Sequence, residues 1–219
     1  MLFATVLVHG QGRVFYTGAL PEFAVSRAMG DQFGVTAKVE SMHGAYRQSS
    51  ELSGRWQHIH ERTDIQLFVI NKINPFWRLS VGYQHRFLGG GGLVYRTIQQ
   101  IAAVQQNTGY RLGHRFRTDQ TFSAQETPEF RFRYRLSAEA ALEGQSVDPR
   151  EFYLKFSEEL IYSNQGGKSG LENRLVAVLG HNFSRTFKLE TGLDYRTDRF
   201  LDGDFRQRLW LKIGLFLNI

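Results

Sequence analysis

Arginine side chains recur at alternate positions in two segments of this chain, and carboxylates lie in the segments that follow. Arg131, Arg133 and Arg135 are two residues apart, and Glu159 and Glu172 follow in later segments. A guanidinium group is planar and donates paired hydrogen bonds to a carboxylate, so these residue types indicate ion pairing rather than a reaction. The side chains that we expect to form an ion-pair network are Arg115, Arg117, Asp119, Arg131, Arg133, Arg135, Glu151, Lys155, Glu159, Glu172, Arg174, Glu190, Asp194 and Arg196.

The seven histidines raise the alternative of a metal site. His58 and His60 would lie on the same face of a strand, a spacing that allows chelation. A protein metal site needs three or four ligands, and the chain has no cysteine and no third ligand beside this pair. We therefore predict neither a metal nor another cofactor.

Serine–histidine hydrolysis is the second chemical alternative, and it needs a serine oxygen beside a histidine that a third group orients. Ser80 and His85 are close in sequence, but a strand would turn them to opposite faces. The chain has no G-x-S-x-G motif. The glycines at 89–92 lack the Lys-Ser/Thr of a phosphate loop and predict a hairpin turn. We predict no catalytic residue, and a lipid hydrolase stays as an alternative.

Extended segments must position these side chains, and residues 130–142, FRFRYRLSAEAAL, show the clearest one. Aromatic and aliphatic residues take the even positions, while arginine, serine and glutamate take the odd positions as far as 139. Successive side chains of a strand point to opposite faces, so this strand has one apolar and one charged face. In a soluble sandwich the apolar face is the core, whereas in a membrane barrel it contacts lipid and the charges line the lumen.

Similar patterns mark eleven segments and predict an all-β fold. They lie at residues 13–29, 33–40, 55–72, 77–87, 93–104, 110–119, 130–142, 151–159, 171–179, 187–196 and 208–219. Bacterial single-chain barrels have even strand numbers, so the prediction is an antiparallel transmembrane β-barrel of about 10–12 strands. The irregular segment 13–29 is then expected to split at Pro21 or to lie outside the barrel, and residues 43–54 are expected to form a polar loop.

Three features favour a membrane barrel over a soluble sandwich. The strands are about 10–14 residues long, which suits a tilted transmembrane strand. The charged face carries both signs on neighbouring strands, as expected of side chains that pair across a confined lumen. The chain also closes in a strand on Ile219, whose parity is that of the apolar face. Aromatic residues make up 14% of the chain, which suits aromatic girdles at membrane interfaces.

The bulk composition limits the organisation and the partners. A length of 219 residues fits a single barrel domain, predicted at 13–219, and the apolar residues 1–12 are interpreted as a signal-peptide remnant. Mean hydropathy is −0.35, and no run of about 18 apolar residues could form a transmembrane helix. The net charge of +6 is spread over the strands, so no nucleic-acid partner is expected.

An ordered set of short motifs resembles a known bacterial family. The motifs are Gln99-Gln100, HRFRTDQTF at 114–122, RFRYRL at 131–136, EFYLK at 151–155, Glu158-Glu159, ENRL at 172–175 and GLDYR at 192–196. Together they resemble the domain of unknown function 2490 family, from about Val35 to the C-terminus. The resemblance implies an outer-membrane β-barrel of Gram-negative bacteria, with outer-membrane lipid and the barrel-assembly machinery as partners, and it implies no reaction. The chain departs from the usual aromatic last residue of such barrels by ending on Ile219.

These observations predict an outer-membrane barrel that is structural or forms a narrow or blocked channel with a basic, ion-paired lumen. Its exterior should carry one set of apolar side chains: Phe130, Phe132, Tyr134, Leu209, Leu211 and Ile213. Any leak should prefer anions, because rings of Arg and Lys favour anions in pores. The alternatives are an open water-filled pore, an outer-membrane lipid hydrolase and a soluble β-barrel that binds a ligand. No sequence feature specifies an oligomeric state.

Overall fold

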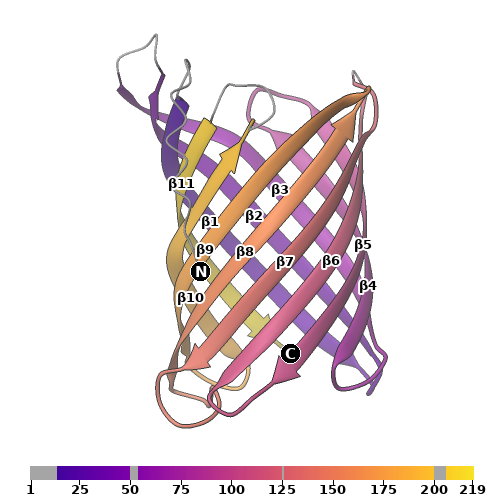
Figure 1. Cartoon of the computed structure of the whole chain (residues 1–219), viewed down its shortest axis with the longest axis vertical. Helices are drawn as coiled ribbons and strands as arrows, with labels where there is room; N and C mark the ends of the chain where they lie inside the picture. Colours follow the sequence, from indigo (N-terminus) through magenta and orange to yellow (C-terminus); the bar gives the residue numbers. More distant parts are fainter. Residues whose placement is uncertain (1–13, 50–53, 125, 200–205) are drawn as a thin grey trace, which may run out of the picture.

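The computed structural model describes residues 14–49, 54–124, 126–199 and 206–219, and within them eleven strands form a closed barrel (Figure 1). The strands are β1 (Val14–Met29), β2 (Phe33–Gln48), β3 (Arg55–Lys72), β4 (Trp77–Leu88), β5 (Leu93–Gln106), β6 (Tyr110–Ser123), β7 (Glu129–Ala141), β8 (Phe152–Gln165), β9 (Lys168–Asn182), β10 (Phe187–Asp198) and β11 (Arg206–Asn218). The segment 1–12, interpreted above as a signal remnant, lies outside the described residues. Among the described residues, no helix has the length and apolar character needed to cross a membrane.

The alternation of residue types decides which face of each strand points into the barrel. On β7, Phe132 is 57% exposed whereas its neighbour Arg133 is 8% exposed. On β8, Phe156 is 52% exposed whereas Glu159 is 1% exposed. The apolar parity therefore faces outward and the charged parity faces the lumen, as the alternation predicts for a barrel. Phe130, Leu211 and Ile213 are also exposed on the exterior.

The barrel closes through a parallel pair of strands. Consecutive strands run antiparallel, so with an odd number of strands the first and the last point in the same direction. The β1–β11 pair is accordingly parallel, from Val14 opposite Arg206 to Ser26 opposite Asn218. The expectation of an even strand number was therefore wrong.

Strand β1 is continuous and belongs to the barrel, which corrects the expectation that residues 13–29 would split at Pro21 or lie outside it. Pro21 has no amide hydrogen and cannot donate to a ladder. The β1–β2 register accommodates this residue, because pairing passes from Ala19–His43 directly to Glu22–Glu40 without changing phase. Pro21 keeps its place opposite Ile213 on the parallel side.

The β2–β3 hairpin is longer than the sequence pattern predicts. Residues 43–48, expected in a loop, continue β2. The register between the two strands shifts between Met42 and His43 and again between Gly44 and Tyr46, each time because β3 has one extra residue, so β2 stays regular along its pairing with β3. Pairing of β3 with β4 ends at Arg62 and Leu88, so the hairpin rises beyond the end of β4 (Figure 1).

Apolar packing also occurs inside the barrel. Leu20, Met42 and Trp210 are fully buried and contact one another on the lumen side of β1, β2 and β11. The lumen is filled by side chains from opposite walls, as in other small barrels. The lumen therefore contains a small apolar cluster on β1, β2 and β11 beside its charged side chains.

Candidate functional site

The charged side chains that point inward from the strands surround a central cavity of about 300 Å³. Among the described residues, thirteen Lys and Arg side chains line this cavity, against five Asp and Glu. Three further carboxylates, Asp119, Glu159 and Glu172, form ion pairs with arginines of the lining. Cations still outnumber carboxylates when these three are included.

Glu159 is the centre of the largest cluster. Arg115 Nη2 lies 2.6 Å from Glu159 Oε1, and Arg133 Nη2 lies 2.6 Å from Oε2. Arg135 Nη2 is 3.3 Å and Arg174 Nη1 is 4.0 Å from Oε2. One buried carboxylate on β8 therefore holds guanidinium groups from β6, β7 and β9.

Arg133 extends this cluster toward β6. Its Nη1 lies 3.2 Å from Asp119 Oδ2, and Arg117 Nε donates to Asp119 Oδ1 at 2.6 Å. The Arg133 side chain is 7% exposed and that of Asp119 is fully buried. Buried ion pairs are stable only when both charges are well hydrogen-bonded, and this arrangement meets that condition for Asp119.

A second cluster lies around Glu172 and Asp198. Arg174 Nε is 2.6 Å from Glu172 Oε1, and Arg131 and Arg208 each approach Glu172 to 3.4 Å. Arg208 also donates to Asp198 at 2.5 Å. Arg174 contacts both Glu159 and Glu172, so it joins the two clusters into one network.

The opposite wall holds ion pairs that the sequence analysis did not include. Glu22 on β1 lies 3.0 Å from Lys38 and 2.6 Å from Lys212. Asp64 on β3 accepts two hydrogen bonds from Arg86, at 2.6 and 2.7 Å. The alternation of side chains along each strand could have shown that these residues face the lumen. For Glu22 the irregular pattern of residues 13–29 obscured which face it lies on. Other paired residues absent from the predicted set are Glu40, Arg62, Arg111, Glu129, Glu139, Asp198, Arg206 and Arg208.

The remaining predicted residues divide into two local pairs and one exception. Lys155 contacts Glu190, which also accepts a hydrogen bond from the Tyr153 hydroxyl at 2.8 Å. Asp194 accepts two hydrogen bonds from Arg196, at 2.7 and 2.8 Å. Glu151 lies before β8, in the connection from β7, and accepts the Asp148 amide at 3.0 Å. This connection places Glu151 outside the lumen network, because the strand begins only at Phe152.

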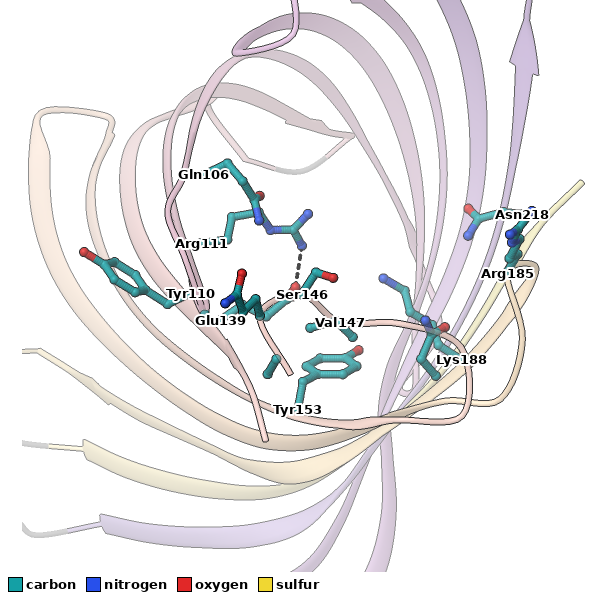
Figure 2. Close-up of a pocket in the computed structure, with 14 residues that line it drawn as sticks. Gln106, Tyr110, Arg111, Glu139, Ser146, Val147, Tyr153, Arg185, Lys188 and Asn218 are labelled. Atoms are coloured by element: carbon teal, nitrogen blue, oxygen red, sulfur yellow. Dashed lines mark hydrogen bonds and ion pairs between the residues drawn. The ribbon is translucent and has the colours of Figure 1, made fainter. Parts of the chain in front are cut away.

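A second cavity of about 310 Å³ lies at the end of the barrel where β7 is joined to β8 (Figure 2). Arg111, Tyr153 and Lys188 surround it in Figure 2, and Arg111 Nη2 lies 2.7 Å from Glu139 Oε1. The connecting segment 142–151 forms backbone hydrogen bonds with Gly109, before β6, and with Asn182, at the end of β9. The backbone amide of Gly109 donates to the Gln145 carbonyl at 3.0 Å, and the backbone amide of Arg150 donates to the Asn182 carbonyl at 2.5 Å. The connection therefore narrows this mouth of the lumen.

Comparison with family models gives one match over residues 32–206, described as Protein of unknown function (DUF2490). This match covers most of the chain, from the turn before β2 to the start of β11. The chain belongs to the DUF2490 family. No curated protein and no solved structure matches this DUF2490 chain.

Several guanidinium nitrogens in the DUF2490 lumen have no partner among the described residues. The Nε atoms of Arg115, Arg133 and Arg135 are buried without a hydrogen bond. Arg96 is 3% exposed and donates from Nε to Thr121 Oγ1 at 2.8 Å, and no described carboxylate forms an ion pair with it. The cavity therefore combines excess positive charge with unused hydrogen-bond donors, a combination that attracts anions.

The serine and histidine weighed in the sequence lie on opposite sides of the DUF2490 barrel wall. Ser80 is buried in the lumen, where Gln100 Nε2 lies 3.3 Å from its hydroxyl. His85 packs against Tyr95 with ring centroids 4.5 Å apart, and Tyr95 is exposed on the exterior. No three His, Cys, Asp or Glu side chains of the described residues converge in a way that could hold a metal ion.

Proposed function

We propose that this DUF2490 protein is a bacterial outer-membrane β-barrel whose lumen is constricted by an Arg–carboxylate network and conducts small anions in preference to cations. The observation that carries the proposal is the central cavity, lined by thirteen cationic side chains and five carboxylates among the described residues. Rings of Arg and Lys favour anions in pores.

The exterior of the barrel supports the membrane location. Leu67 and Val81 are each 59% exposed in the middle of their strands. Exposed aromatic residues gather near both ends of the strands, at Phe76, Trp77, Tyr110, Phe152 and Phe183 on one side and at Trp56, Phe87, Tyr95, Phe122, Phe130 and Tyr162 on the other. An outward-facing apolar band flanked by two aromatic girdles is typical of transmembrane barrels. A soluble barrel would leave this apolar surface in water, at a high risk of association.

The ion pairs support a narrow lumen. Long side chains from β6, β7, β8 and β9 meet at Glu159 and Glu172, so the network extends over four neighbouring strands on the lumen side. Most of these guanidinium groups are largely buried and share their carboxylates, which limits their freedom to move aside. An open, water-filled pore would instead leave them solvated.

Planar-bilayer recording of the refolded protein tests the proposal. We expect conductance that is small or absent, with a reversal potential in a salt gradient that indicates anion preference. Large, stable conductance with cation preference would contradict it. Flotation of the protein with lipid vesicles tests the membrane location separately, and failure to float after refolding would contradict that part.

A further inference from the structure

A serine and two histidines form a hydrogen-bonded chain on the exterior of the β2–β3 hairpin. The Ser41 hydroxyl lies 2.8 Å from His43 Nε2, and His43 Nδ1 lies 3.2 Å from His58 Nε2. The two imidazole rings are inclined by 17° with centroids 5.4 Å apart. With the nitrogens only 3.2 Å apart, this separation means that the rings meet edge to edge and nearly coplanar. One ring can therefore orient the other.

Ser41 and His43 share a face because they lie two residues apart on β2, and the fold adds His58 from β3. Ser41 has the parity of Val39, which is exposed on the exterior, and its partner Thr63 has the parity of exposed Ile65. The register shift after Met42 leaves Glu61 of β3 unpaired, so His60 pairs with His43 and His58 comes to the outer face within reach of His43. Bulges of this kind are frequent beside active sites because they redirect side chains.

We propose that Ser41 and His43 form the catalytic pair of a lipid acyl hydrolase on the outer wall of the barrel, with His58 as a positioning residue. The arrangement has the parts that nucleophilic catalysis needs, namely a hydroxyl, a base at hydrogen-bond distance and a third group that orients the base. The lipid substrate rests on the proposed membrane location, whereas the chemistry of the pair does not.

The position of Ser41 fits an ester bond of a membrane lipid. Its partner Thr63 pairs with Phe87, one step before the β3–β4 ladder ends at Leu88. Ser41 therefore lies at the rim of the barrel, level with an aromatic residue of the girdle. Girdles mark the boundary between hydrocarbon and headgroups, the depth at which acyl chains are esterified to glycerol.

The surfaces on either side of Ser41 match the two parts of such a lipid. Val39 and Ile65 form the adjacent pair toward the centre of the barrel, and they are 39% and 42% exposed. They offer an apolar track for an acyl chain. Toward the tip of the hairpin, the imidazole groups of His43 and exposed His58 give a polar surface that suits a headgroup.

The reaction follows from the hydrogen bonds. With the proton of His43 on Nδ1 and donated to His58, Nε2 is free to accept the Ser41 proton. The Ser41 oxygen then bonds to the ester carbon, the ester C–O bond breaks, and the leaving alcohol takes the proton from His43. A water molecule, deprotonated by His43, next attacks the acyl-serine, which releases the fatty acid and returns the proton to Ser41. The Thr63 hydroxyl, 2.9 Å from Ser41 Oγ, holds the nucleophile on its other side.

The test uses the full chain, refolded in detergent micelles that contain phosphatidylethanolamine. We expect release of free fatty acid, and covalent labelling by a fluorophosphonate that mass spectrometry maps to Ser41. Ser41→Ala should abolish both, and His43→Gln should lower the rate at least about 100-fold, as expected for loss of a general base. Ser80→Ala in the lumen and His85→Gln on the same outer wall are matched controls and should keep the rate.

The role of His58 needs a different measurement. His58→Phe should lower kcat with KM unchanged, because the Nδ1–H of His43 loses its acceptor. His58→Gln keeps an acceptor oxygen and should restore much of kcat. An unchanged kcat in His58→Phe would remove His58 from the proposal.

Three results would overturn the proposal: no fatty acid release by the folded protein, an adduct at another residue, or an unchanged rate in Ser41→Ala. Adduct mapping uses the unaltered chain, so its result does not depend on the folding of a variant. Folding is followed by the heat-dependent shift in gel mobility. A protein that inserts into vesicles without hydrolysing lipid contradicts only the hydrolase, and one that hydrolyses ester without inserting contradicts only the membrane location.

Discussion

Arg133 and Glu159 meet on a diagonal of the barrel wall, with Arg133 Nη2 donating to Glu159 Oε2 at 2.6 Å. The register places Ile161, not Glu159, directly opposite Arg133. A long arginine side chain reaches such a diagonal neighbour easily. The same guanidinium group also contacts Asp119 on β6, so Arg133 links three neighbouring strands on the lumen side of the wall.

Replacing Arg133 should widen the constriction. Arg133→Ala leaves Asp119 paired with Arg117 and Glu159 paired with Arg115, so the wall should persist while the cavity grows. We expect a larger single-channel conductance and a weaker anion preference in planar bilayers. The matched control is Arg111→Ala, because Arg111 is 45% exposed at the mouth. Equal conductance in the two variants would contradict the central role of Arg133.

Removing the charge of Glu159 should destabilise the barrel strongly. Glu159→Gln leaves four neighbouring guanidinium groups without their shared carboxylate, and breaking a buried pair in this way costs about 3–5 kcal/mol. Glu139→Gln, whose partner Arg111 is partly exposed, should cost only about 0–1 kcal/mol. Urea unfolding of the vesicle-inserted proteins measures both. Equal losses would show that burial of the network does not control its energetics.

A charge on the outer wall should be costly only at the middle of the barrel. Leu211, 48% exposed near the centre of β11, should destabilise the folded state by about 2–4 kcal/mol when changed to Arg, the range for the bilayer midplane. Leu217→Arg, near the end of the same strand, should cost about 0–1 kcal/mol. Folding titrations into lipid vesicles compare the two. A soluble barrel would show no dependence on position along the strand.

Gly180 provides the space that Tyr153 occupies in the lumen. A Cβ atom at Gly180 would lie 2.1 Å from Tyr153 Cζ, so Gly180→Ala must displace the ring and its hydrogen bond to Glu190. We expect a loss of about 1–3 kcal/mol, typical of overpacking. Gly90→Ala meets no atom within 4 Å and should change stability by less than about 0.5 kcal/mol. Thermal unfolding distinguishes them, and similar values would contradict the packing argument.

The sequence alone determined which residues share a face. A strand alternates its side chains with a period of two, so the parity of Arg131, Arg133 and Arg135 follows from local geometry wherever these residues are extended. The same rule separated Ser80 from His85, which the structure places on opposite sides of the wall.

Only the tertiary structure decided how the strands close and which side chains meet. Closure depends on the strand count and the register of the whole sheet, so local pattern could not reveal the parallel β1–β11 pair. The partners of Arg133 depend on the stagger between strands, and the contact of His43 with His58 depends on a bulge in β3 that breaks the regular alternation. Alternation is a property of one strand, whereas pairing and register are properties of the barrel, and for that reason the lumen network was predicted as a set of residues and not as a set of bonds.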